Sequence, residues 1–150
     1  MSPKGQAGVV LAKGALTSKT SGEGEIRKAL VSEANVIDCI VNLPAKLFLN
    51  TQIPAALWFM RRDRVGSTKY KDRSNEILFI DARNLGHLIN RRTKVLSDED
   101  IKLITETYHN WRNQDGEYVD VAGFCASVPL EKVAELDYVL TPRPLCWFGR

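Results

Sequence analysis

An aromatic residue stands in a short polar loop between two apolar stretches, residues 36–43 and 53–60. The loop side chains that could contact a ligand are Lys46, Phe48, Asn50 and Thr51. Enzymes that modify a nucleic-acid base rotate it out of the stack and can hold its face against an aromatic side chain. Neighbouring polar or basic side chains can then bind phosphate or sugar. The residue types alone leave a second interpretation open, in which Phe48 packs in the core beside two leucines.

A basic segment follows the second apolar stretch. Residues 61–73 contain six basic and two acidic side chains, whereas the net charge of the whole chain is +3. The basic members are Arg61, Arg62, Arg64, Lys69, Lys71 and Arg73. Such a local excess of positive charge suits contact with phosphates. A solvated hairpin loop is the alternative interpretation.

Other polar residues give weaker indications of chemistry. Gly22 and Gly24 precede an expected helix, but no strand leads directly into them and adjacent glutamates would repel a phosphate. Asp81 ends an expected strand, and we interpret it as a cap or as an ion-pair partner of Arg83. The three cysteines and two histidines have no metal-ligand spacing, so we expect no zinc site, and we interpret His109 as a surface or packing residue.

Length and composition indicate one globular domain. The chain has 150 residues, of which 44% are hydrophobic and 26% charged. No apolar stretch approaches the roughly 20 residues that a transmembrane helix needs. The first residues lack the apolar region of a signal peptide. We therefore expect a cytoplasmic protein.

Hydrophobic patterning predicts a mixed α/β arrangement. We expect strands at residues 8–12, 36–43, 53–60 and 76–82, and helices at 23–34, 98–112 and 130–136. Strand, helix and strand in succession imply a right-handed parallel crossover. The short connection after residue 43 then implies that the next strand runs antiparallel. Residues 118–124 are expected to be irregular.

Specific side chains are expected to form the core. In the first helix the buried face is predicted to contain Ile26, Ala29, Leu30 and Ala34. Ser97 is the expected N-cap of the second long helix. The buried stripe of that helix is predicted to contain Ile101, Ile104, Tyr108 and Trp111. Trp58 and Phe59 lie on opposite sides of one strand, and we expect both in the core.

Several segments together resemble one protein family. They are Val36-Ile-Asp-Cys-Ile-Val-Asn-Leu-Pro44, Ile80-Asp-Ala-Arg-Asn-Leu-Gly86, Asp98-Glu-Asp-Ile101, Thr107-Tyr-His-Asn-Trp111, Tyr118-Val-Asp-Val-Ala-Gly-Phe-Cys125 and Tyr138-Val-Leu-Thr-Pro142. These sequence segments resemble the modification (M) subunit of type I restriction-modification systems, a DNA adenine-N6 methyltransferase. The resemblance extends over nearly the whole chain and indicates the C-terminal part of such a subunit.

The resemblance implies a fold and a division of the chain. We expect part of a Rossmann-like methyltransferase sheet, with parallel strands and an antiparallel last strand inserted between the two before it. The implied strand order is 8–12, then 53–60, then 36–42, and the place of strand 76–82 is left open. Residues 1–95 would belong to the α/β domain, and residues 96–142 would form a helical extension.

The resemblance also implies which residues act. Phe48 would stack on the flipped adenine. The expected DNA contacts are Lys46, Asn50, Thr51, Arg61, Arg62 and Arg64. The family binds S-adenosylmethionine with a glycine-rich turn and the target adenine with an Asn-Pro-Pro-Phe motif. This chain contains no Asn-Pro pair, so no catalytic or cofactor-binding residue is assigned.

The implied partners are DNA, a specificity subunit and a second modification subunit. We expect the chain to be inactive alone. An alternative is a non-enzymatic module that binds DNA or a partner and completes the sheet of a separate N-terminal half.

The family pattern breaks after Pro142. The family continues with Gly-Arg-Tyr-Val-Gly, whereas residues 143–147 are Arg-Pro-Leu-Cys-Trp. The nucleotide sequence CGG-CCG-TTA-TGT-TGG-T encodes Arg-Pro-Leu-Cys-Trp. Read one base later, it encodes Gly-Arg-Tyr-Val-Gly. Our hypothesis is that residues 143–150 form an out-of-frame tail.

Overall fold

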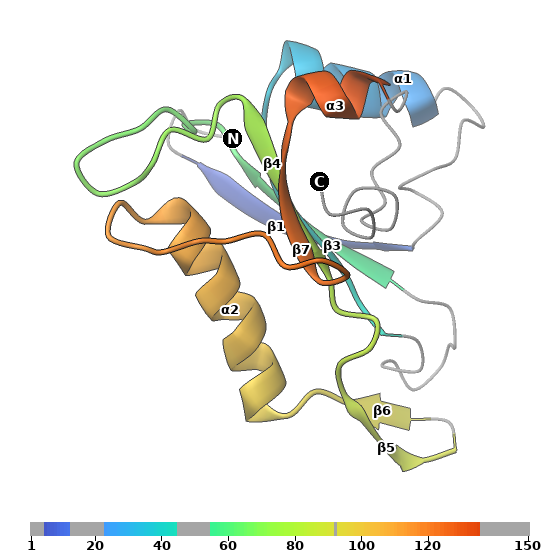
Figure 1. Cartoon of the computed structure of the whole chain (residues 1–150). Coiled ribbons are helices and arrows are strands. Elements are labelled where there is room, and N and C mark those ends of the chain that lie inside the picture. The colour runs from blue at the N-terminus through green and yellow to red at the C-terminus, as the bar shows by residue number, and fades with distance from the viewer. Residues whose placement is uncertain (1–4, 13–22, 45–54, 92, 136–150) are drawn as a thin grey trace.

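A five-stranded mixed sheet forms the centre of the structure, a computed structural model that describes residues 5–12, 23–44, 55–91 and 93–135 (Figure 1). The strands, in chain order, are β1 (Gln6–Ala12), β2 (Ile37–Asn42), β3 (Ala55–Arg61), β4 (Glu76–Asp81) and β7 (Cys125–Pro129). Their order across the sheet is β1-β3-β2-β4-β7. The predicted order of the first three strands is therefore confirmed, as is the α/β class.

Strand directions agree with the predicted crossover. β3 pairs antiparallel with both β1 and β2, so β1 and β2 run parallel to each other. The sequence left the place of β4 open, and the structure pairs it parallel with β2. β7 pairs antiparallel with β4 at the far edge. We did not predict β7, which brings part of the expected helical extension into the sheet.

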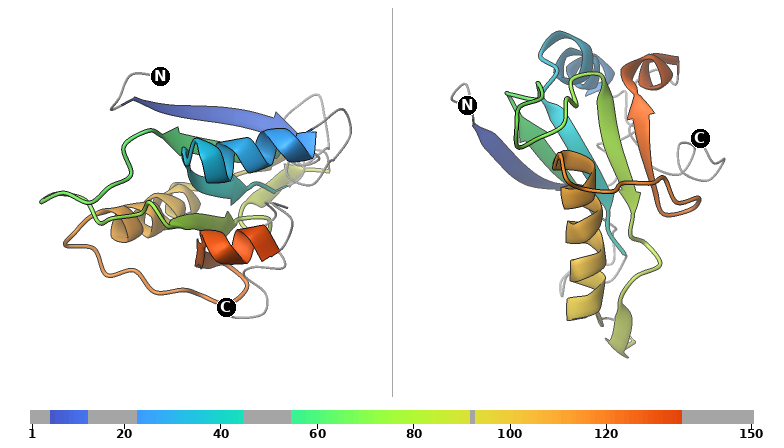
Figure 2. Two further views of the ribbon diagram at one scale, coloured as in Figure 1. Left: turned by 90° about the horizontal axis from the view of Figure 1, so that it is seen from above. Right: turned by 60° about the vertical axis from the view of Figure 1, so that its left-hand side comes forward.

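One face of the sheet is covered by α1 (Glu23–Lys28), the π-helical turn η3 (Ala29–Glu33) and α3 (Leu130–Glu135) (Figures 1 and 2). The predicted buried face of this first helix is partly wrong. Ile26 is 58% exposed, whereas Arg27 and Val31 are buried. The amide of Ala34 donates to the carbonyl oxygen of Ala29, an i to i+5 bond that departs from the 3.6-residue period assumed in the prediction.

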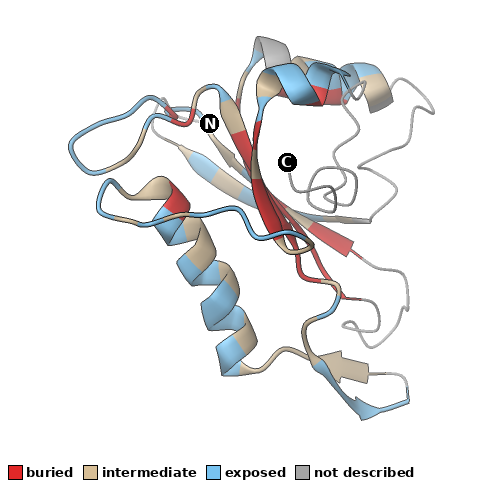
Figure 3. Ribbon diagram, in the orientation of Figure 1, coloured by how far each residue is buried: buried red, intermediate tan, exposed pale blue. Residues whose placement is uncertain are grey.

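The other face is covered by α2 (Asp98–Arg112). Ser97 is its N-cap, as predicted, and forms reciprocal 3.1 Å hydrogen bonds with Asp100. Trp111 is buried, and its indole nitrogen donates to Ser127 Oγ at 2.7 Å. Ile104 and Tyr108 pack against the same core, whereas Ile101 is exposed, contrary to the prediction. Figure 3 shows the outer side of this helix exposed to solvent.

Two predictions for β3 had different outcomes. Trp58 is buried in the core beneath α1 and η3, as expected. Phe59 points to the opposite face but is 38% exposed, so its predicted place in the core is wrong. Its ring instead lies 6.4 Å from that of Tyr108.

A small hairpin extends from the sheet between β4 and α2. It consists of β5 (His87–Asn90) and β6 (Thr93–Val95), which the sequence did not reveal (Figure 1). All of β5 is exposed. Among the described residues, no helix is both long and apolar enough to cross a bilayer.

Candidate functional site

The predicted site residues fall in two segments of the chain, of which the structure describes one. Lys46, Phe48, Asn50 and Thr51 lie outside the described residues. The loop that carries them leaves β2 at its carboxyl end and enters β3 at Ala55. Arg61, Arg62 and Arg64 belong to the described residues, and Arg61 is the last residue of β3. The seven residues of β3 separate Ala55 from Arg61 by about 20 Å.

Polar side chains lie at the carboxyl ends of β2 and β4. Asn42 and Asp81 are partners in the parallel register, and both are buried. Arg83 Nη2 lies 2.6 Å from Asp81 Oδ2, which confirms the interpretation of Asp81 as its ion-pair partner. Within the described part of the chain, neither Oδ1 nor Nδ2 of Asn42 has a hydrogen-bond partner. Sequence reasoning missed Asn42, although it and Asp38 are the two polar residues of an otherwise apolar stretch.

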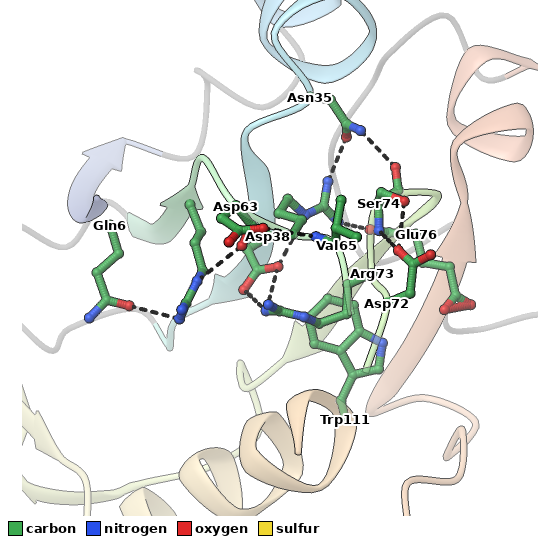
Figure 4. Close-up of polar contacts among 12 residues, drawn as sticks. Gln6, Asn35, Asp38, Asp63, Val65, Asp72, Arg73, Ser74, Glu76 and Trp111 are labelled. Atoms are coloured by element: carbon green, nitrogen blue, oxygen red, sulfur yellow. Dashed lines mark hydrogen bonds and ion pairs between the residues drawn. The ribbon is translucent and has the colours of Figure 1, made fainter. Parts of the chain in front are cut away.

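A buried ionic network occupies the amino end of β2 (Figure 4). The Asp38 carboxylate accepts from Arg64 Nε at 3.1 Å, from Arg73 Nη1 at 2.8 and 3.0 Å, and from the Tyr108 hydroxyl at 2.6 Å. The three charged side chains are each at most 2% exposed. This network joins β2, the basic segment and α2.

Arg64 is therefore not placed to contact DNA as we predicted. Besides Asp38, its guanidinium donates to Asn35 Oδ1 at 2.7 Å and to the carbonyl oxygen of Glu76. Burial lowers the pKa of Arg64, although the Asp38 charge opposes this effect. The physical reason for the correction is that a carboxylate inside the apolar strand β2 needs buried cations to compensate it.

Tyr108 is held as a hydrogen-bond donor in this network. Burial, the Asp38 charge and the hydrogen bond to Asp38 raise the pKa of Tyr108 well above its ordinary value. The hydroxyl is therefore protonated at neutral pH, where it donates to Asp38.

A second group of cations lies beside this network, around an aromatic ring that the sequence analysis did not single out. The ring of Tyr70 lies 4.9 Å from the Arg61 guanidinium carbon, 5.4 Å from Lys69 Nζ and 4.7 Å from the Arg112 guanidinium carbon. We call these four residues the Tyr70 cluster. Arg112 also lies 5.1 Å from the ring of Tyr108.

The positive potential of the cluster acts on the tyrosine itself. Partial desolvation would raise the pKa of Tyr70, but the Lys69 side chain and the charges of Arg112 and Arg61 outweigh it and lower the pKa. The hint in the sequence was a tyrosine inside the basic segment. Arg112 was not foreseeable, because it comes from the end of a helix about 40 residues later in the chain.

A cleft of about 410 Å³ adjoins the cluster between the sheet and α2. Its wall includes Phe59, Ile104 and Tyr108, and its rim includes Arg61 and Arg112. The predicted surface or packing role of His109 is consistent with its position, because this exposed residue also lines the cleft.

Two observations on the described residues concern a metal and S-adenosylmethionine. No group of three potential metal ligands occurs among them. Of the two parallel strands whose following residues are described, β2 leads into Leu43 and Pro44, and β4 into Ala82 and Arg83. Neither connection is the glycine-rich turn that holds this cofactor in the family named above.

Comparisons with known proteins agree with the sequence resemblance. A family model described as N-6 DNA Methylase matches residues 1–145. The chain is 44% identical over 142 residues to the type I restriction enzyme HindI methylase subunit of Haemophilus influenzae, covering 95% of this chain and 30% of that protein. It is 39% identical over 141 residues to the MjaIX methylase subunit of Methanocaldococcus jannaschii, covering 93% of this chain and 24% of that protein.

A solved structure shows the same fold. The methyltransferase subunit of a type I restriction-modification system from Streptococcus thermophilus superposes with a TM-score of 0.73 at 30% sequence identity, covering 91% of this chain and 25% of that one. The chain thus spans less than a third of the length of these relatives.

Proposed function

Because the chain belongs to the N-6 DNA methylase family, we propose that it is part of the modification subunit of a type I restriction-modification system. The parent reaction is transfer of a methyl group from S-adenosylmethionine to N6 of adenine in DNA. The observation that carries the proposal is 44% identity along 95% of the chain to a type I methylase subunit.

In this proposal the loop between β2 and β3 contributes to target-base binding. Phe48 stacks on the flipped adenine, while Lys46, Asn50 and Thr51 contact the DNA backbone. The loop leaves the carboxyl end of β2, and open α/β sheets bind their ligands at this edge. Arg61 and Arg62 contact DNA at the opposite end of β3. Arg64 is withdrawn from the set because it is buried.

The remaining parts of the parent enzyme come from chain that the relatives contain beyond the matched region. S-adenosylmethionine binds to that other portion, and the present chain is inactive alone. A specificity subunit and a second modification subunit are the proposed partners, in keeping with the type I assignment of the relatives.

A second candidate function is a non-enzymatic module that docks on a separate N-terminal half. β1 is the edge strand of the sheet, so its outer backbone groups are available to another strand. An apolar groove of about 200 Å³ lies beside this edge, lined in part by Val9, Leu11, Ile26 and Met60. These features support completion of the sheet by a partner.

Methyl transfer with purified components tests both candidates. The chain is assayed alone and together with the polypeptide encoded by the reading frame immediately upstream. Adenine methylation only in the mixture is the expected result. A stable complex without methylation would favour the non-enzymatic module. If the mixture formed no complex and showed no methylation, the proposal would be overturned.

A further inference from the structure

The Tyr70 cluster contains three cations that no acidic group balances among the described residues. Within this part of the chain, Arg61 donates only to two uncharged oxygens, Gln6 Oε1 and the carbonyl oxygen of Asp63. Arg112 Nε approaches the amide oxygen of Asn113 at 3.4 Å. Among the described residues, no carboxylate lies within ion-pair distance of Arg61, Lys69 or Arg112.

The acidic side chains beside the cluster accept hydrogen bonds from groups outside it. Asp63 Oδ1 accepts from the amide of Val65 at 3.3 Å. Asp38 is enclosed by Arg64, Arg73 and Tyr108. An oxygen of Asp72 accepts from the hydroxyl and the amide of Ser74. Three like charges around one ring repel each other, and contact with the ring offsets this only in part. A bound anion would remove the remaining repulsion.

The cluster is held in place from two sides. The segment before and after Tyr70 is tied to the end of α2, because Gln114 Nε2 donates to the carbonyl oxygens of Ser67 and Tyr70. Lys71 Nζ donates to the carbonyl oxygens of Asn110 and Gly116. The cations therefore project from an anchored segment and a helix end rather than from a freely moving loop.

We propose that the Tyr70 cluster is a phosphodiester-binding site that holds a nucleic-acid backbone at the end of the sheet where β3 ends. Cations grouped around a half-buried aromatic ring suit a chain of phosphates, which presents one charge every 3.4 Å along each strand. The proposal rests on the proposed DNA function, and it adds Lys69, Tyr70 and Arg112 to the contacts expected from sequence. It places these contacts about 20 Å, or roughly six nucleotides, from Ala55 at the start of β3.

The test is binding of the 150-residue chain to a non-specific DNA duplex, measured by fluorescence anisotropy at several salt concentrations. The variant pair Arg61→Gln and Lys69→Gln is compared with the control pair Lys102→Gln and Lys132→Gln. Both pairs lower the net charge from +3 to +1, and the control lysines are exposed on α2 and α3, away from the cluster.

The first pair should reduce the slope of log affinity against log salt by about 1.8, since each lost phosphate contact contributes about 0.9. Its affinity should then fall about tenfold less than that of the wild type between 50 and 200 mM salt. The control pair should leave the slope near the wild-type value. Lys69→Gln alone, at an exposed position, should reduce the slope by about 0.9 and guards against a folding defect in the double variant.

Three results would overturn the site: no duplex binding at low salt, equal slopes for both pairs, or equal competition by polyglutamate per unit charge, which would indicate an acidic protein partner. The methyl-transfer assay separates this proposal from the proposed function. Cluster-dependent DNA binding without reconstituted methylation would leave the site standing and remove the proposed part of the chain in methyl transfer. Methylation with unchanged salt slopes would do the reverse.

Discussion

Replacing Asp38 by asparagine should strongly destabilise the fold. The substitution keeps the shape of the side chain but removes the charge that compensates two buried arginines, Arg64 and Arg73. Breaking a buried ion pair by removing one partner typically costs about 3–5 kcal/mol, because an uncompensated charge is left inside the protein. For a chain of this length, such a loss corresponds to a fall in Tm of roughly 6–20 °C.

Urea unfolding followed by circular dichroism measures the effect. The matched control is Glu106→Gln, which removes the exposed pair between Lys102 and Glu106, whose atoms lie 3.8 Å apart. That pair contributes about 0.3–0.5 kcal/mol at most. Tyr108→Phe removes a single hydrogen bond to Asp38 and should cost an intermediate amount, about 1.5–3 kcal/mol. If Asp38→Asn and the control were equally stable, the network would not hold the fold as described.

Three further predictions concern other parts of the chain. Asn42→Leu should leave stability unchanged or raise it by about 1 kcal/mol in urea unfolding, because it removes a buried amide without partners in the described structure, and a clear loss of stability would show that the amide is in fact paired. Phe48→Ala should reduce methylation by the reconstituted enzyme with little change in melting temperature, and Phe48→Trp should retain much of the activity. If Phe48→Ala instead lowered the free energy of unfolding by about 3–5 kcal/mol and left the specific activity normal, Phe48 would belong to the core. The chain alone should bind S-adenosylmethionine no better than an unrelated protein in calorimetry, and micromolar binding would contradict the assignment of the cofactor site to another part of the parent enzyme.

Local patterns in the sequence predicted the elements with strong periodicity. The apolar stretches gave β1 to β4, and Ser97 with the acidic first turn gave the start of α2. The place of β4 could not be predicted, because a strand with buried residues on both faces fits any interior position of a sheet. β7 was missed because its sequence, Cys-Ala-Ser-Val-Pro, is short and ends in a proline, a residue that is tolerated at a sheet edge.

The candidate site depended on contacts between distant residues, which sequence spacing does not reveal. Asp38 contacts Tyr108 across 70 positions of the chain, and the Tyr70 cluster unites the end of β3, the following segment and the last turn of α2. Counting charges correctly indicated a basic segment. A count of charges could not distinguish the buried arginines from the other cations of the segment. Arg64 and Arg73 form ion pairs with the buried Asp38 carboxylate, whereas Arg61 and Lys69 remain at the surface.

The buried network and the surface cluster are in contact through neighbouring side chains. Tyr108 donates to Asp38 while its ring lies 5.1 Å from Arg112, and Arg73 contacts Asp38 while lying 5.8 Å from the ring of Tyr70. Asp38 therefore orients two side chains that neighbour the phosphate site without facing it. A partly destabilised variant such as Tyr108→Phe, assayed below its melting temperature, should keep the wild-type salt slope because every surface cation remains. Its DNA affinity should nevertheless fall, since the cations would be held less firmly. A changed slope in Tyr108→Phe would instead mean that the network contributes charge directly to binding.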